Sequence, residues 1–343
     1  MKQPLIVLTG PTASGKTALS IGLAKAIGGE IISADSMQVY RQMDIGTAKI
    51  RPEEMEGIPH YLVDVLEPDA SFNVVIFQQM AREAMARIRA NGHVPIIVGG
   101  TGFYIQAILN DIDFKENEDD GYRTQLEEMA AKEDGPEKLY EMLKKVDPES
   151  AEKIHGHNIK RVIRALEYFH QTGQKISEHN EQEAQKESPY NFAYFVLNRP
   201  REILYDRIDK RVDQMMEEGL VEEVRSLKEH GYDRSLVSMQ GLGYKEILAY
   251  LDGEITLEEA VYILKRDTRH FAKRQLTWFK REREVLWIDQ SQYDGKEAIL
   301  TDMIHILRQK RHNRRILYHI IGKTASGSVN RFRRCVIILR RKQ

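Results

Sequence analysis

Cysteine is nearly absent from the sequence, since Cys335 is the only one in 343 residues. This excludes an internal disulfide framework and a zinc site built from cysteines. Long apolar runs are also missing: none approaches the roughly 18 residues of a membrane-spanning helix, and residues 1–4 do not begin a signal peptide. Motifs of zinc proteases (H-E-x-x-H) and serine hydrolases (G-x-S-x-G) do not occur. We therefore expect a cytoplasmic protein that does not associate with membranes.

Acidic residues are missing from the end of the chain. Residues 303–343 contain none of the 52 Asp and Glu but 12 of the 51 Lys and Arg, so the formal net charge of −1 conceals a basic C-terminus. Basic tails often attract nucleic acid, although an extension with no part in the folded enzyme would look the same. We expect residues 314–343 to be a basic C-terminal extension, disordered or non-native, without catalytic function.

A glycine-rich loop is the strongest motif present. It follows an apolar run at residues 5–8, precedes a helix-compatible segment at 18–24 and fits the pattern G-x-x-x-x-G-K-[ST]. In such loops backbone N–H groups and a helix N-terminus bind phosphates, a lysine neutralises them and a hydroxyl contacts Mg²⁺. A chance glycine turn is the alternative, but the flanking strand and helix supply the expected context. The candidate phosphate-binding residues are Gly10, Pro11, Thr12, Ala13, Ser14, Gly15, Lys16 and Thr17.

Two polar residues follow apolar runs that read as strands. Asp35 follows residues 31–34, and Thr101 follows residues 94–98 through a glycine pair. Strand, phosphate loop, helix and strand form a βαβ unit, for which a parallel sheet is expected, and strand ends in such sheets face the ligand crevice. Asp35 is therefore a candidate catalytic group, although a helix N-cap or a water-mediated Mg²⁺ ligand explains it equally well. Residues 60–65 also read as a strand.

The middle of the chain changes character. Residues 111–188 are helical and highly charged, and the next strong strand pattern is at 192–197. We therefore predict a discontinuous core, residues 1–114 plus 196–313, with a helical insertion domain at 115–195. Arg207 and Arg211, four residues apart on the next helix, are either salt-bridge partners or a lid over a diphosphate. A helix at 257–283 interleaves cations with aromatics, which makes nucleic acid a credible partner.

Together these motifs resemble one family, the bacterial tRNA dimethylallyltransferases, also called tRNA isopentenyltransferases. The matching stretches follow the family's order from about residue 4 to about residue 310; they are residues 10–17, 35–40, 44–49, 98–101, 161–167, 240–246 and 273–278. The resemblance implies an α/β fold with a P-loop NTPase-like parallel sheet flanked by helices. It also implies transfer of a dimethylallyl group from dimethylallyl diphosphate to N6 of the adenosine 3′-adjacent to the anticodon.

The resemblance assigns roles to particular residues. It implies that Asp35 is the general base, that Thr101 orients it, and that Lys16 and Arg211 bind the diphosphate while Thr17 holds Mg²⁺. The expected partners are dimethylallyl diphosphate and the anticodon stem-loop of tRNA, bound by a monomer. The residues that resemble the family's tRNA contacts are Asp35, Ser36, Met37, Gln38, Thr101, Arg123, Ile159, Lys160, Arg161, Val162, Ile163, Lys273, Arg274 and Gln275.

Two other functions share the phosphate loop. A small-molecule kinase using ATP would show a compact arginine-bearing lid, whereas this chain has a long helical insertion and a basic aromatic helix. A nucleotide-dependent RNA-binding module would not need Asp35 and Thr101 at adjacent strand ends. Nucleotide binding at the loop is possible on sequence grounds but unnecessary for prenyl transfer.

Overall fold

The structure is a computed structural model that describes residues 2–114 and 120–313. The basic extension expected at 314–343 lies outside these residues. The centre of the fold is a six-stranded sheet in the order β3-β2-β4-β1-β5-β6, with every neighbouring pair parallel. The predicted α/β class with a parallel sheet is therefore confirmed. The strands are β1 (Gln3–Thr9), β2 (Gly29–Ser33), β3 (His60–Tyr61), β4 (Val94–Gly99), β5 (Tyr190–Asn198) and β6 (Val285–Asp289).

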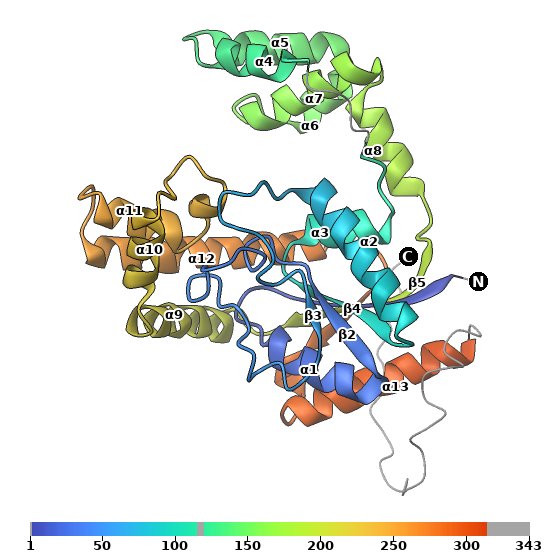
Figure 1. Cartoon of the computed structure of the whole chain (residues 1–343). Helices are drawn as coiled ribbons and strands as arrows, with labels where there is room; N and C mark the ends of the chain where they lie inside the picture. The colour runs from blue at the N-terminus through green and yellow to red at the C-terminus, as the bar shows by residue number, and fades with distance from the viewer. Residues whose placement is uncertain (1, 115–119, 314–343) are drawn as a thin grey trace, which may run out of the picture.

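Helices cover both faces of this sheet (Figure 1). One face packs against α1 (Lys16–Ile27) and α13 (Lys296–Asn313) through an apolar cluster that includes Leu8, Leu23 and Met303. The other face carries a larger cluster built with the remaining core helices. These are α2 (Val74–Ala90), α3 (Gly102–Leu109), α9 (Arg201–Glu217), α10 (Leu220–Glu229), α11 (Tyr244–Leu251) and α12 (Leu257–Phe279). Because both faces are covered, the strands are almost continuously apolar, as parallel sheets require.

The insertion has an apolar core of its own. Leu126, Leu139, Leu143 and Leu166 are buried together, away from the two sheet clusters. In Figure 1 the helices α4 to α7 stand apart from the sheet and α8 connects them to it. The division into a core of residues 1–114 plus 196–313 and an insertion of residues 115–195 stays a prediction, and β5 begins at Tyr190, before the second predicted boundary. The helices are α4 (Tyr122–Ala130), α5 (Gly135–Val146), α6 (Pro148–Lys153), α7 (Ile159–Thr172) and α8 (Ile176–Gln185).

Asp147 joins α6 to α8 inside the insertion. Its fully buried carboxylate accepts hydrogen bonds from the backbone N–H and the hydroxyl of both Ser150 and Ser177, at 2.7–3.0 Å. These bonds favour the charged form, so the pKa of Asp147 is lowered even though burial acts in the opposite direction. The four hydrogen bonds satisfy the buried carboxylate. They also fix the position of α6 relative to α8.

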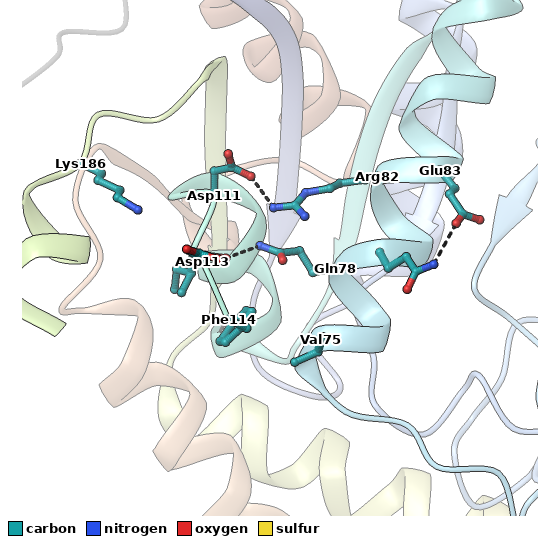
Figure 2. Close-up of a pocket in the computed structure, with 10 residues that line it drawn as sticks. Val75, Gln78, Arg82, Glu83, Asp111, Asp113, Phe114 and Lys186 are labelled. Atoms are coloured by element: carbon teal, nitrogen blue, oxygen red, sulfur yellow. Dashed lines mark hydrogen bonds and ion pairs between the residues drawn. The ribbon is translucent and has the colours of Figure 1, made fainter. Parts of the chain in front are cut away.

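The two connections between core and insertion lie beside each other. A pocket of about 560 Å³ is lined by α2, by the outgoing residues 111–114 and by Lys186 of the returning chain (Figure 2). Gln78 on α2 donates to the carbonyls of Ala107 and Ile112, both at 2.9 Å, and so fixes the outgoing segment. This pocket therefore belongs to the junction and not to the phosphate loop.

The strand expected at residues 60–65 is shorter in the structure. β3 contains only His60 and Tyr61, because Leu62 and Asp64 adopt left-handed backbone angles (φ 62° and 60°) that end the ladder. The backbone N–H of Asp64 donates instead to the carbonyl of Gln38, at 3.0 Å. No helix in the described part of the chain has both the length and the apolar character to cross a membrane.

Candidate active site

The glycine-rich loop joins β1 to α1, as its sequence predicts. Gly15 adopts a left-handed conformation (φ 87°) as the N-cap of α1, so the helix begins at Lys16. Gly10 lies against the end of β5, where a Cβ would come within 2.7 Å of the Leu197 carbonyl oxygen. Neither position accepts a larger side chain without a backbone shift. The loop therefore presents its N–H groups and the N-terminus of α1 to one side.

Three side chains from distant parts of the chain fix the backbone of this loop. They come from α12, from α9 and from the turn that follows β6. The bonds are Thr12 N–H to Gln275 Oε1, Arg207 Nε to the Ala13 carbonyl and Gln290 Nε2 to the Ser14 carbonyl, each 2.9 Å long. Arg207 therefore contacts the loop and lines the pocket beside it, and its role as a lid over a diphosphate stays a prediction.

A pocket of about 440 Å³ opens beside the loop. Its cations are Lys16, Arg207, Lys210 and Arg211, and its single carboxylate is Asp35. This excess of positive charge suits a polyanion such as a diphosphate. The remaining lining residues are Thr12, Ala13, Gly15, Thr17, Gln38, Thr47, Val98, Gly99, Gly100, Gln214, Phe271 and Gln275.

Lys16 lies on the floor of this pocket. Its Nζ donates to the carbonyls of Gly10 (3.0 Å) and Pro11 (2.9 Å). Burial lowers the pKa of Lys16 to about 8; Arg211 lowers it further, whereas Asp35 raises it. Burial also lowers the pKa of Arg211. Two desolvated cations in one pocket favour binding of an anion, because an anion would restore the charged form of Lys16 and offset the desolvation of the Arg211 guanidinium.

Ser14 has the one buried hydroxyl oxygen in the loop that lacks a hydrogen-bond partner within the described residues. Its Oγ lies 3.0 Å from the position that a Cβ on Gly10 would occupy, so it faces the inside of the loop. Buried hydroxyls are normally satisfied. The arrangement fits an anion that would accept this hydrogen bond.

Asp35 and Thr101 leave neighbouring strands, as predicted. The Asp35 Oδ1 accepts from the backbone N–H of Met37 (2.9 Å) and Gln38 (3.4 Å), which fixes the orientation of the carboxylate. The Thr101 N–H donates to the Ala34 carbonyl (3.2 Å), directly before Asp35. Asp35 lines the pocket with Lys16 and Thr17, whereas Thr101 is adjacent to the lining residues Gly99 and Gly100.

Other residues of the predicted RNA-binding segment 35–38 have structural contacts. Gln38 lines the pocket and donates to the carbonyls of Thr47 and Ala48, at 3.3 and 3.2 Å. Met37 packs against Gly241, where a Cβ would lie 2.5 Å from its Cε. Ser36 is half-buried. Asp35 and Gln38 of this segment therefore belong to the lining of the pocket, and the RNA contacts of the segment stay a prediction.

The α12 residues separate into two groups. Lys273 and Arg274 are exposed, and the Arg274 guanidinium lies 5.7 Å from the ring centroid of Phe271, which lines the pocket. Gln275, in contrast, is only 6% exposed and faces the loop. Lys273 and Arg274 are therefore accessible to RNA, whereas the side chain of Gln275 is buried and bonds to the phosphate loop.

The insertion residues separate in the same way. Lys160 and Arg161 are exposed, whereas the side chains of Val162 and Ile163 are buried in the insertion core and Ile159 packs at its edge. The expectation of RNA contacts is therefore corrected for the Val162 and Ile163 side chains, which the apolar period of α7 directs inward. Arg123 lies on α4, paired with Glu127 (3.0 Å) and Glu167 (3.2 Å), away from the pocket.

Glu223 on α10 is a residue that the sequence did not indicate. Its carboxylate accepts the backbone N–H groups of residues 44–46 at 2.7–3.0 Å and the Tyr244 hydroxyl at 2.7 Å. It thereby shapes the loop that carries Thr47 to the pocket. Its partners in this loop lie more than 170 positions away in the sequence, so no local pattern signals the contact.

Comparisons with known proteins agree with this geometry. A family model described as IPP transferase matches residues 38–282. The tRNA dimethylallyltransferase of Lachnoclostridium phytofermentans is 67% identical over 309 residues, covering 90% of this chain and 98% of the relative. That of Carboxydothermus hydrogenoformans is 51% identical over 300 residues, covering 87% and 94%.

Solved structures give the same result. The tRNA isopentenylpyrophosphate transferase of Bacillus halodurans matches with a TM-score of 0.69 and 43% identity, over 91% of this chain and 98% of that one. A eukaryotic dimethylallyltransferase acting on tRNA matches with a TM-score of 0.75 and 30% identity, over 94% and 82%. The P-loop NTPase-like fold is confirmed, and the kinase and RNA-binding-module alternatives lose their support. This chain belongs to the family of tRNA dimethylallyltransferases.

Proposed function

We propose that this protein transfers the dimethylallyl group of dimethylallyl diphosphate to N6 of the adenosine 3′-adjacent to the anticodon of tRNA, releasing diphosphate. Its curated relatives are tRNA dimethylallyltransferases, so the enzyme is a prenyltransferase. The observation that carries the proposal is the pocket in which Lys16 and Arg211 lie beside a single carboxylate, Asp35. Such a pocket combines a site for a polyanionic leaving group with a proton acceptor.

The leaving group is stabilised from one side of the pocket. As the bond between the allylic carbon and the diphosphate oxygen breaks, negative charge accumulates on the diphosphate. Lys16, Arg211 and the N-terminus of α1 lie where they would stabilise that charge, and the Ser14 hydroxyl would donate to it. Because these groups are fixed before the substrate arrives, little reorganisation is needed at the moment of reaction.

The nucleophile is activated by the one carboxylate among the lining residues of the pocket. An exocyclic amine is a weak nucleophile, because its lone pair is delocalised into the base. While N6 forms its bond to the allylic carbon, it loses a proton, and Asp35 is the group in the pocket lining suited to accept it. Two backbone N–H groups bind Oδ1 of this carboxylate and so keep it oriented. Thr101, the N-cap residue of α3, donates its N–H to the Ala34 carbonyl directly before Asp35 and is proposed to orient the base.

The pocket suits Mg²⁺ only if the phosphates of the substrate supply some of its ligands. Within the described residues there is no group of three or more His, Cys, Asp or Glu that could hold a metal. Mg²⁺ commonly keeps several waters and binds through one or two protein oxygens plus substrate phosphates, a pattern that the Thr17 hydroxyl would suit. When bound, the ion would neutralise charge on the diphosphate. We propose Thr17 as its protein ligand.

The RNA is proposed to lie across the exposed cations of both domains. Lys273 and Arg274 on α12, with Lys160 and Arg161 on α7, are exposed cations, and we propose that they neutralise backbone phosphates. The adenosine must leave its stack to enter the pocket, which costs a few kcal/mol that such contacts offset. We propose that the enzyme acts as a monomer, in the cytoplasm where tRNA is found.

The direct test uses the purified protein, radiolabelled dimethylallyl diphosphate, Mg²⁺ and an unmodified tRNA with adenosine next to the anticodon. We expect label in the tRNA and release of one diphosphate per transfer. A matched tRNA carrying guanosine at that position is the control and should remain unlabelled. Equal labelling of both RNAs, or no labelling together with ATP-dependent phosphorylation of a metabolite, would refute the proposal.

A further inference from the structure

The side-chain amide of Gln275 connects three parts of the active site. It reaches from α12 into a tightly packed space between the phosphate loop and the turn after β4. Oε1 accepts from the Thr12 N–H at 2.9 Å, and Nε2 donates to the Gly100 carbonyl at 3.0 Å. Because one contact is a donor and the other an acceptor, the amide has a single satisfactory orientation.

The amide is tightly packed where it meets the turn after β4. Gln275 is 6% exposed, and a Cβ on Gly100 would come within 2.2 Å of its Nε2. Three residues further along α12, Trp278 packs on Gly102 in the same way, with a Cβ contact of 2.2 Å. The helix therefore approaches the strand ends as closely as glycine allows, and a displacement of α12 would move Gln275 relative to both partners.

The residues before Gln275 face the opposite environment. Lys273 and Arg274 are exposed and lie on the same helical turn as the buried amide. Thr12 and Gly100 line the pocket proposed for the diphosphate. A single helical turn thus carries cations accessible to RNA and an amide bonded to the phosphate loop.

We propose that Gln275 is a positioning residue that couples tRNA binding on α12 to diphosphate binding at the phosphate loop. It holds the Thr12 and Gly100 backbones in the arrangement that receives the diphosphate, and its own position is set by the helix on which the RNA rests. Each substrate therefore strengthens binding of the other, since coupling between two sites is reciprocal. The inference rests on the proposed function of the pocket.

The test compares Gln275→Ala with Gln78→Ala as a matched control. Gln78 is a buried glutamine, 4% exposed, whose amide also makes two backbone hydrogen bonds, but it lies at the domain junction (Figure 2). Both variants should lose comparable thermal stability. Because Gln275→Ala releases the Thr12 and Gly100 backbones from the arrangement that receives the diphosphate, it should raise the KM for dimethylallyl diphosphate roughly 10- to 100-fold. Gln78→Ala should leave it unchanged.

The coupling itself is measured by the dissociation constant of tRNA with and without an unreactive thiolodiphosphate analogue of the prenyl substrate. We expect the analogue to tighten tRNA binding in the wild type and in Gln78→Ala, and to have little effect in Gln275→Ala. The affinity for tRNA alone should stay within about twofold. A Gln275→Met variant, which keeps the volume without the hydrogen bonds, should behave as Gln275→Ala does.

Three results would overturn the inference. The first is that both Gln275 variants show the same KM for dimethylallyl diphosphate and the same dissociation constants for tRNA as Gln78→Ala, because Gln275 would then have only a structural role. The second is weakened tRNA affinity with unchanged diphosphate affinity, which would make Gln275 an RNA contact. The third needs no variant: fast hydrogen exchange of the Thr12 amide in the wild-type protein. If the wild type fails to transfer prenyl groups at all, it is the proposed function that fails.

Discussion

The lowered pKa of Lys16 predicts a specific pH dependence for substrate binding. With a pKa of about 8 in the free enzyme, Lys16 is roughly nine-tenths protonated at pH 7 and roughly one-tenth protonated at pH 9. A bound diphosphate supplies negative charge next to Nζ and raises this pKa. Binding therefore takes up a proton at alkaline pH, so the affinity is fully present well below pH 8 and declines as the pH rises through 8. Between pH 7 and pH 9 the association constant for dimethylallyl diphosphate should fall about tenfold.

The assay is isothermal titration calorimetry of dimethylallyl diphosphate without tRNA, from pH 6.5 to 9.5. Titrations at pH 8.5 in two buffers of different ionisation enthalpy would count the protons taken up. The control is Lys16→Arg, because a guanidinium stays protonated over this range; its affinity should lose the dependence whatever its absolute value. An affinity for the wild type that is constant to within twofold between pH 7 and 9, or an equal decline in Lys16→Arg, would refute the reasoning.

Three further predictions concern the base, the loop and the RNA-binding surface. Asp35→Asn should lower kcat by about 10²- to 10⁴-fold while tRNA affinity stays within twofold; single-turnover rates and filter binding test this, and wild-type turnover would remove Asp35 from its role. Glu223→Ala should lower the free energy of unfolding by about 2 kcal/mol, because four donors lose a carboxylate acceptor. A urea titration that gives the wild-type free energy of unfolding would show that the loop carrying Thr47 does not depend on Glu223. Replacing both Lys273 and Arg274 by alanine should make the slope of log K against log salt shallower by about 1 to 2; an unchanged slope would mean that α12 does not contact phosphates.

The parts of the site that were predictable are those that the sequence encodes locally. The phosphate loop is a contiguous motif, and the strand ends that carry Asp35 and Thr101 follow from apolar runs. Their convergence then follows from parallel pairing, because such strands share one edge of the sheet. The family resemblance connected these elements to a reaction.

The parts that were not predictable depend on long-range contacts. Gln290 bonds to the phosphate loop across 276 positions of sequence, and Glu223 bonds to the backbone N–H of Gly46 across 177. A lone glutamine or glutamate on a charged helix gives no sign of such a partner. The contacts of Gln275 were also not predictable, because the stretch 273–278 that contains it has both exposed and buried positions. Strand β3 was overestimated because left-handed angles at Leu62 and Asp64 leave no signal in hydropathy.

The separate core of the insertion has a consequence for how the chain folds. β5 pairs with β1 at the centre of the sheet although 187 positions separate the paired residues, for example Gln3 and Tyr190, so this pairing requires closure of a long loop. Because the insertion contains its own apolar cluster and the Asp147 contacts, it has what it needs to form from local interactions before that pairing takes place. Its two connections lie side by side at the pocket lined by residues 111–114 and Lys186. Once the insertion has folded, β5 therefore begins close to the point where the chain left the sheet. The loop that must close before β5 pairs with β1 is then effectively shorter, so we expect this pairing to be faster.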